Sequence, residues 1–334
     1  MIVSWNTTNA CNLLCRHCYR DAGVRAEEEL STGEGLKLID EIAESGFKIM
    51  IFSGGEPLMR PDIHTLVSHA AQRGLRPVFG TNGTLIDRSG AKRLKGSGAA
   101  AMGISLDSAD YKKHDSFRGV EGSWQKAVEG MRACREEGLP FQVHTTVVDW
   151  NYDEIEEITD FAVQEGALAH HFFFLVPTGR GADIESESLR EEAYEKILER
   201  IMIKQKQVDI ELKPTCAPQF MRIASQLGVK TRFSRGCLAG TAYCIISPVG
   251  NVQPCAYLDI SAGNVRETPF SEIWKDNPVF NRLRTLEYGG GCGACHYRKV
   301  CGGCRARALY YHGDYMAEEP WCLYRKEREL GIRN

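Results

Sequence analysis

The stretch Cys11-Asn-Leu-Leu-Cys15-Arg-His-Cys18 places three cysteines in C-x3-C-x2-C spacing, directly after a short apolar run from Ile2 to Trp5. Thiolates select soft or borderline metals, and cysteines this close together can surround one metal centre. A closed structural zinc site needs four ligands, and no fourth cysteine lies nearby in the sequence. A [4Fe–4S] cluster held by three thiolates would instead leave one iron free to bind a small molecule.

Size and composition are those of a soluble globular protein. The chain has 334 residues, 43% of them hydrophobic and 25% charged, which suggests one large domain with a smaller one, or two domains. A net charge of −3 gives no reason to expect a nucleic-acid partner. The sequence has neither a run of about 18 apolar residues nor a signal segment, so we expect no membrane contact and a cytoplasmic protein.

The cysteines are numerous and unevenly distributed. Of thirteen, three lie near the N-terminus and eight lie between Cys237 and Cys322. A disulfide scaffold would need an oxidising compartment, for which the sequence carries no signal, so metal binding is the better explanation. Cys134 falls on an apolar helical stripe, and we expect it in the core.

The first half of the chain alternates short β-rich runs with amphipathic helical segments. Six such units predict an α/β fold with a parallel sheet and helices outside it. The predicted strands are Ile2–Trp5, Lys48–Phe52, Arg76–Phe79, Ala101–Leu106, Phe141–Val148 and His170–Val176.

Polar or glycine-rich segments follow three of these strands. Parallel α/β sheets bind ligands at the carboxyl ends of their strands, where these segments would lie together. Individually, each could also be a turn or a helix cap. The segments are Ser53-Gly54-Gly55-Glu56-Pro57, Thr81-Asn82-Gly83 and Ser105-Leu106-Asp107.

The three-cysteine loop and the Gly-Gly-Glu-Pro segment together resemble the radical S-adenosylmethionine (SAM) enzymes. The resemblance implies a partial (β/α)6 TIM-like barrel in which Cys11, Cys15 and Cys18 hold a [4Fe–4S] cluster. In that family the open iron binds the amino and carboxylate groups of SAM, and one electron cleaves SAM to a 5′-deoxyadenosyl radical. The SAM-binding residues that it implies are Gly54, Gly55, Glu56, Pro57, Asn82, Ser105 and Asp107.

The C-terminal cysteines resemble the SPASM extension of radical SAM enzymes, which binds two auxiliary [4Fe–4S] clusters. Zinc ribbons use similar C-x2-C pairs and are the alternative. Carried over to this sequence, the resemblance assigns Cys237, Cys244, Cys255 and Cys304 to the first auxiliary cluster. It assigns Cys292, Cys295, Cys301 and Cys322 to the second. One spacing departs from the family pattern: two residues, Gly302 and Gly303, stand before Cys304 where three are usual.

These signals predict three parts of the chain. A radical SAM partial barrel would span residues 1–180, and a linker helix with the loop around Cys216 would span residues 181–236. A SPASM domain with two auxiliary clusters would span residues 237–334.

The resemblance is closest to the NirJ/AhbC/AhbD-type proteins of alternative heme biosynthesis, in particular to the second NirJ paralogue. It implies a tetrapyrrole substrate, with oxidative decarboxylation of two propionates of iron-coproporphyrin III to the vinyl groups of heme b. An electron donor such as ferredoxin or flavodoxin would reduce the first cluster. The alternatives are removal of acetate side chains from didecarboxysiroheme, a SPASM-type peptide or protein maturase, and a non-enzymatic zinc-binding adaptor.

Catalytic residues are not identifiable by motif, but five residues could face the substrate. Bidentate cations suit substrate carboxylates, and imidazole or thiolate suits a porphyrin iron. For Cys216, two flanking prolines indicate a rigid loop rather than a core helix. The candidates are Arg180, Arg222, His170, His171 and Cys216.

Overall fold

The computed structural model describes residues 1–324, and a nine-stranded sheet runs through that part of the chain. Strands β1 to β8 are parallel, β9 is antiparallel to β8, and the order is β7-β6-β5-β4-β3-β2-β1-β8-β9. The strands are β1 (Ile2–Asn6), β2 (Ile49–Ser53), β3 (Arg76–Thr81), β4 (Ala101–Ser105), β5 (Phe141–Val147), β6 (Ala169–Phe174), β7 (Glu211–Thr215), β8 (Tyr243–Ile246) and β9 (Val252–Gln253).

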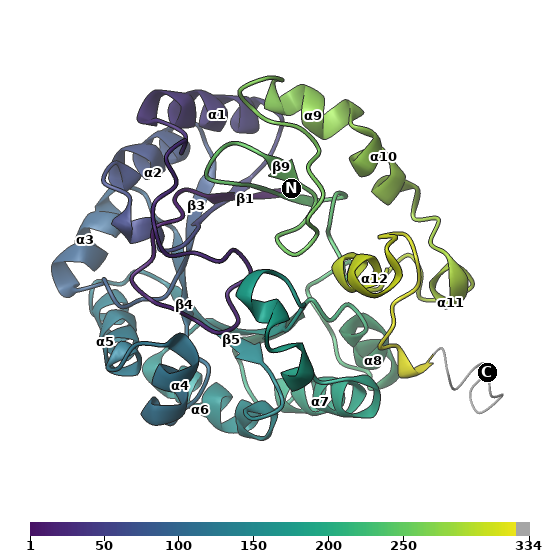
Figure 1. Ribbon diagram of the computed structural model, residues 1–334. Helices are drawn as coiled ribbons and strands as arrows, with labels where there is room; N and C mark the ends of the chain where they lie inside the picture. The colour runs from purple at the N-terminus through teal and green to yellow at the C-terminus, as the bar shows by residue number, and fades with distance from the viewer. Residues whose placement is uncertain (325–334) are drawn as a thin grey trace.

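Helices follow the strands along the chain and form an arc outside the curved sheet (Figure 1). The arrangement is the α/β fold with a parallel sheet that the sequence predicts. The helices are α1 (Thr32–Glu44), α2 (Ile63–Gln72), α3 (Arg88–Gly96), α4 (Tyr111–Arg118), α5 (Ser123–Glu136), α6 (Ile155–Glu165), α7 (Glu191–Gln205), α8 (Phe220–Gln226), α9 (Phe270–Asp276), α10 (Pro278–Thr285), α11 (Gly290–Gly293) and α12 (Arg305–His312).

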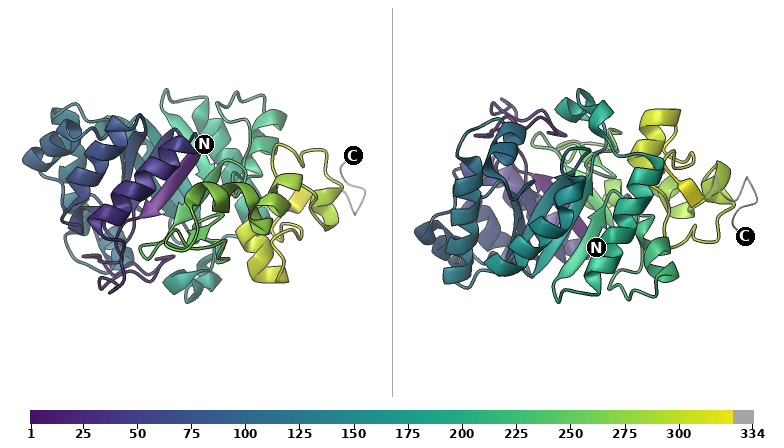
Figure 2. Two further views of the ribbon diagram at one scale, coloured as in Figure 1. Left: turned by 90° about the horizontal axis from the view of Figure 1, so that it is seen from above. Right: turned by 90° about the horizontal axis from the view of Figure 1, so that it is seen from below.

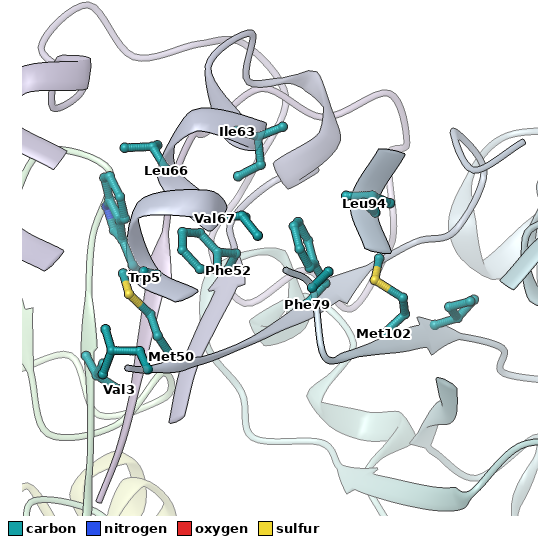
Figure 3. Close-up of a cluster of buried hydrophobic side chains, with 14 of the residues drawn as sticks. Val3, Trp5, Met50, Phe52, Ile63, Leu66, Val67, Phe79, Leu94 and Met102 are labelled. Atoms are coloured by element: carbon teal, nitrogen blue, oxygen red, sulfur yellow. The ribbon is translucent and has the colours of Figure 1, made fainter. Parts of the chain in front are cut away.

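The main core lies between the outer face of the sheet and these helices. Successive strand residues point to opposite faces, so Trp5 and Phe52 lie on the outer face with Leu66 of α2, and all three are fully buried (Figure 3). Fully burying an apolar side chain contributes about 1.5–3 kcal/mol. The inner face carries the partly exposed alternate residues, among them Ser53 and His144. The sheet therefore presents an apolar outer surface to the helices, and its inner surface carries polar side chains on β4 to β7.

The sheet has more strands than the sequence indicated. All six predicted strands are present, but β7 was expected to be part of a linker. Its sequence, Glu-Leu-Lys-Pro-Thr, is a weak strand signal because Pro214 cannot donate a ladder hydrogen bond. The strand tolerates Pro214 because β7 lies at the edge of the sheet.

The cysteine-rich segment begins inside this sheet. Strand β8 pairs with β1, with Ile2 opposite Tyr243 and Val3 opposite Cys244. Helix α9 then packs near α1, where Phe270 and Trp274 contact the ring of Phe47 at centroid distances of 5.4 and 5.1 Å. The remaining C-terminal elements lie at one end of the molecule (Figure 2). Residues 325–334 of the predicted third part lie outside the described residues.

Within residues 1–324, none of the helices is both long enough and apolar enough to cross a bilayer.

Candidate functional site

The three-cysteine loop, which carries Cys11, Cys15 and Cys18 and is called the cluster loop below, follows β1. Backbone hydrogen bonds to neighbouring segments hold it in place. The N–H of Cys11 donates to the carbonyl of Gly23 (3.0 Å), and that of Leu14 donates to the carbonyl of Arg118 (3.1 Å). Cys11, Cys15 and Cys18 are half-buried free thiols. Burial raises the pKa of Cys11 to about 11, so a bound metal would have to displace its proton.

The two glycines after β2 allow the chain to pass directly against the start of this loop. The N–H of Gly55 donates to the carbonyl of Thr8 (2.8 Å), and that of Glu56 donates to the carbonyl of Ala10 (2.7 Å). A Cβ atom on Gly54 would lie 2.4 Å from the Thr8 carbonyl oxygen, and one on Gly55 would lie 2.3 Å from that of Ala10. Both positions therefore require glycine for close backbone approach.

The carboxylate of Glu56 connects the ends of β2 and β3. It accepts hydrogen bonds from the Thr81 hydroxyl (2.8 Å), the Asn82 N–H (2.9 Å) and the Leu58 N–H (3.1 Å). Burial raises the pKa of Glu56 to about 7, and these hydrogen bonds oppose the shift. Pro57 follows as the first residue of the short 3-10 helix η1 (Pro57–Met59) and is buried.

Asn82 and Ser105 lie at the neighbouring strand ends. The Asn82 amide donates to the side-chain oxygen of Asn12 in the cluster loop (2.9 Å), and its own oxygen accepts from the Thr84 N–H (2.9 Å). The hydroxyl of Ser105 donates to the carbonyl of Thr81 (3.3 Å) and remains half-buried. Asn82 therefore positions the loop as well as facing the space beside it.

Asp107 acts on the cluster loop through Arg118, a residue that the sequence analysis missed. The Arg118 guanidinium donates to the fully buried Asp107 carboxylate (2.6 Å) and also contacts the Cys15 sulfur (3.7 Å). Burial opposes ionisation of Asp107, but Arg118 outweighs it and holds the pKa of that carboxyl below its usual value. The other Asp107 oxygen accepts the Thr146 N–H (2.8 Å), so this side chain is fully occupied within the protein.

One group of four cysteines surrounds a cavity of about 480 Å³ in the C-terminal part. Several glycines and Tyr297 form other parts of its wall, and the backbone N–H of Glu319 points at the Cys292 sulfur (3.3 Å). Backbone donors to sulfur are typical of iron–sulfur sites. The cavity and donor set fit a [4Fe–4S] cluster. The four cysteines are the predicted second auxiliary set, Cys292, Cys295, Cys301 and Cys322.

The predicted first auxiliary set is not brought together as expected. Cys244 is fully buried in β8 within the main apolar core, and the charged group beside it is Arg284. Cys216 and Cys255 instead pack against the apolar cluster that contains the buried Cys304. The structure therefore places Cys216, which was expected to face the substrate, near cysteines predicted as cluster ligands, and it places Cys244 in the core.

Two further observations place the Cys216 loop near the other cysteines. A Cβ atom on Gly236, next to Cys237, would lie 2.6 Å from Pro218, so the two segments are in direct contact. Burial raises the pKa of Cys216, and the nearby Cys304, Cys255 and Cys237 raise it further. Cys216 also has a left-handed backbone (φ +59°), which is strained for a non-glycine residue and typical of a functional constraint.

Gly302 and Gly303, the two residues of the shortened spacing before Cys304, lie between the two cysteine groups. A Cβ atom on Gly302 would lie 3.7 Å from the Cβ of Cys237, and one on Gly303 would lie 3.2 Å from the sulfur of Cys292. Both glycines have positive φ. The departure from the family spacing is therefore accommodated where the two groups approach each other.

A buried ion pair supports both groups. Arg307 donates to the carboxylate of Glu319 (2.9 Å), and the same carboxylate accepts the N–H of Cys304 (2.6 Å). Both side chains are at most 1% exposed. Because Glu319 also donates its N–H to Cys292, the pair connects the first group to the second.

Three of the other substrate-facing candidates have structural partners. Arg180 donates to the carbonyl of Cys15 (3.0 Å) and so supports the cluster loop. Arg222 is buried in an ion pair with Glu195 (2.6 Å) beside the second cysteine group. His170 points to the outer face and is bonded to the Thr145 and Thr159 hydroxyls (2.7 and 3.0 Å). Each of these three side chains thus has a partner within the protein, and its contact with the substrate stays a prediction.

His171 alone of the five candidates points to the inner face of the sheet. Two neighbouring inner-face residues, His144 and Lys213, were missed by the sequence analysis. The alternation of polar and buried residues along β5 was the available signal.

Comparison with known proteins agrees with this geometry. Residues 5–162 match the Radical SAM superfamily, and residues 237–305 match the SPASM iron-sulfur cluster-binding domain. The chain is 43% identical to a protein named AdoMet-dependent heme synthase from Nitratidesulfovibrio vulgaris, over 99% of this chain and 94% of that protein. It is 35% identical to a Fe-coproporphyrin III synthase from Methanosarcina barkeri, over 99% and 89%.

A solved structure of native anSMEcpe with bound AdoMet has the same fold, with a TM-score of 0.76 over 99% of this chain and 96% of that chain, at 17% identity. The parallel sheet with three free thiols at its carboxyl end thus defines an enzyme of the radical SAM class. This chain belongs to the SPASM-containing radical SAM family that includes the AdoMet-dependent heme synthases.

We predict that Gly55→Ala destabilises the cluster loop. The new Cβ would meet the Ala10 carbonyl, and relieving such overpacking costs about 1–3 kcal/mol. We expect a lower Tm and less iron after anaerobic reconstitution. Gly33→Ala in α1 is the matched control, because a Cβ there has no atom within 4 Å. Equal iron content and Tm in the two variants would contradict the close-approach argument.

We predict that Asp107→Asn lowers the free energy of unfolding by about 3–5 kcal/mol, because it leaves the Arg118 charge buried without its partner. Urea unfolding under anaerobic conditions, followed by circular dichroism, measures this. The exposed Asp149→Asn is the control and should change the value by less than about 0.5 kcal/mol. A similarly small effect of Asp107→Asn would show that the pair does not hold the loop.

Proposed function

We propose that this chain converts iron-coproporphyrin III to heme b by oxidative decarboxylation of two propionate side chains. The observation that carries the proposal is 43% identity to an AdoMet-dependent heme synthase along nearly the whole of both chains. The runner-up reaction is removal of acetate side chains from didecarboxysiroheme. Its support is the similarity to a Fe-coproporphyrin III synthase, which at 35% identity is weaker than the similarity to the heme synthase.

In the proposed reaction, both propionates undergo the same change. Each propionate loses one hydrogen atom from its β-carbon, its carboxylate leaves as CO2, one electron departs, and a vinyl group remains. Bound SAM and its cluster supply the one-electron cleavage that produces the hydrogen-abstracting species. The chain itself must hold the side chain in place, exclude water and oxygen, and provide a route for the surplus electron.

We propose three [4Fe–4S] clusters. Cys11, Cys15 and Cys18 would hold the SAM-binding cluster. Gly54, Gly55, Glu56, Pro57, Asn82 and Ser105 would line the SAM site, whereas Asp107 would act on it through Arg118.

The first auxiliary cluster would be held by Cys216, Cys237, Cys255 and Cys304, with Cys216 in place of Cys244. The proximity of Cys216 to Cys255 and Cys304, and the burial of Cys244 in the core, support this substitution. The second cluster would keep the set Cys292, Cys295, Cys301 and Cys322.

The positions of these groups suggest an electron route. Cys216 directly follows β7, whose inner face borders the space enclosed by the curved sheet, where the substrate would react. The first auxiliary site therefore lies next to that space. The second site opens to a partly exposed cavity. We propose that the surplus electron passes through these sites to an external acceptor. A ferredoxin or flavodoxin would reduce the SAM-binding cluster.

A zinc-binding adaptor is less consistent with the comparisons. Residues 5–162 match the Radical SAM superfamily, and the chain is 43% identical to an AdoMet-dependent heme synthase along nearly its whole length.

Products distinguish the remaining reactions. Anaerobically reconstituted protein would be incubated with SAM, a reductant and either iron-coproporphyrin III or didecarboxysiroheme, and the products weighed by mass spectrometry. The proposal predicts loss of two formic-acid equivalents from iron-coproporphyrin III and no change in didecarboxysiroheme. Conversion of didecarboxysiroheme alone would support the runner-up. No tetrapyrrole conversion, with intact clusters, would favour a peptide or protein maturase.

Cysteine variants test the ligand assignment independently of turnover. Cys216→Ala should lose roughly a third of the bound iron, because one of three four-iron clusters loses a ligand. Cys244→Ala should keep its iron, as should Cys134→Ala, since both replace thiols buried in the main core. Iron analysis and electron paramagnetic resonance (EPR) spectroscopy of the purified variants measure this. Iron loss in Cys244→Ala with retention in Cys216→Ala would restore the sequence-based assignment.

A further inference from the structure

A row of polar side chains crosses the inner face of the sheet on β4 to β7. Strand pairing places Ser105 opposite His144, His144 opposite His171, and His171 opposite Lys213. The row thus extends over β4, β5, β6 and β7. Neighbouring strands lie about 4.8 Å apart, so the row spans roughly 14 Å.

The two histidines form a stacked pair. Their rings lie 5.4 Å apart with an interplanar angle of 8°. The ring of His144 lies over Gly103 of β4, where a Cβ atom would approach it to 2.3 Å. The stacked histidine pair therefore depends on the absence of a side chain at position 103. Gln142 fixes His144 further through its amide, 2.6 Å from Nε2.

His171 differs from His144 because its Nε2 is a buried atom without a hydrogen-bond partner. It faces a carboxylate oxygen of Glu211 at 3.8 Å, an ion-pair contact longer than a hydrogen bond, through which Glu211 raises the pKa of His171 against the larger effect of burial. Burial lowers the pKa of His171, which keeps the imidazole in the neutral form that binds metals. Most buried polar atoms in proteins are hydrogen-bonded, so this Nε2, whose contact with Glu211 is longer than a hydrogen bond, is available to a ligand.

Lys213 supplies a cation next to this pair. Burial lowers its pKa, while Glu211 and Cys216 favour the charged form. Its ammonium also lowers the pKa of both His144 and His171, so it lies near the two rings. Thr215, two residues further along β7, likewise has a buried hydroxyl without a partner. An incoming carboxylate would pair with the ammonium and reduce the cost of its burial.

We propose that this row binds an iron porphyrin. His171 binds the iron through Nε2, Lys213 pairs with a carboxylate at the porphyrin rim, and His144 positions His171 by stacking. The inference rests on the proposed function, which it extends by assigning the substrate-binding residues. Because Lys213 lies near Cys216, this placement also brings a substrate carboxylate close to the first auxiliary site.

Absorption spectroscopy can test the two contacts separately. Reconstituted protein would be titrated anaerobically, without SAM or reductant, with ferric iron-coproporphyrin III and with metal-free coproporphyrin III. In the native chain we expect the Soret band of the iron porphyrin to shift to that of an imidazole-ligated form. His171→Ala should lose this shift and weaken iron-porphyrin binding about tenfold or more, with metal-free binding unchanged. Added imidazole should restore the band.

Lys213→Met should weaken binding of both porphyrins about tenfold, because a charge-assisted contact to a carboxylate does not depend on the iron. His144→Ala should reduce but not abolish the imidazole-type band. His170→Gln is the matched control: this neighbour of His171 lies on the opposite face, so its variant should have a lower Tm but an unchanged Soret band. Iron content and Tm verify that each variant is folded.

An unchanged Soret band and affinity in folded His171→Ala would overturn the assignment of the iron ligand. If the native chain still decarboxylates iron-coproporphyrin III, only this inference fails. If the native chain neither binds nor converts the iron porphyrin, the proposed function fails together with it.

Discussion

The close approach of the Gly54-Gly55 backbone to residues 8–10 is the constraint on which the site depends. The cluster loop has no regular secondary structure of its own, so its position comes from the segments around it. The glycines bind it from β2, Asn82 binds it from β3, and the end of α4 binds it through Phe117 and Arg118. Two strand ends and a helix end thus hold three thiols over one edge of the sheet.

Electrostatics supports the same arrangement. Arg118 brings a buried positive charge to Cys15, and Asp107 balances that charge. In the C-terminal part, Arg307 and Glu319 serve a comparable role by connecting the segments of Cys304 and Cys292. In both places the charged groups are paired within the protein, so they can orient the thiols and their backbone donors.

Much of the fold and of the N-terminal site could be predicted from the sequence. Hydrophobic periodicity identified six strands, and the spacing of three cysteines together with the strand-end motifs identified the edge where they meet. Strand β7 was missed because Pro214 weakens its pattern, and β8 was missed because its partner, β1, lies more than 200 residues away in the chain.

The assignment of Cys244 and Cys216 shows why the rest was harder to predict. Spacing along the chain does not reveal which face of a strand a thiol occupies, and Cys244 is in register with Val3 in the core. Similarly, His170 and His171 are neighbours of one residue type, yet one is bonded to two threonines on the outer face and the other faces the interior. Only the sheet register separates them.

The central claim is that the cluster at Cys11, Cys15 and Cys18 has one iron without a protein ligand, which SAM completes. The most direct measurement is EPR spectroscopy of the reduced, fully reconstituted protein with and without SAM. The account predicts that SAM changes the signal of one cluster and leaves the signals of the auxiliary clusters in place. Identical spectra in the presence and absence of SAM would contradict it.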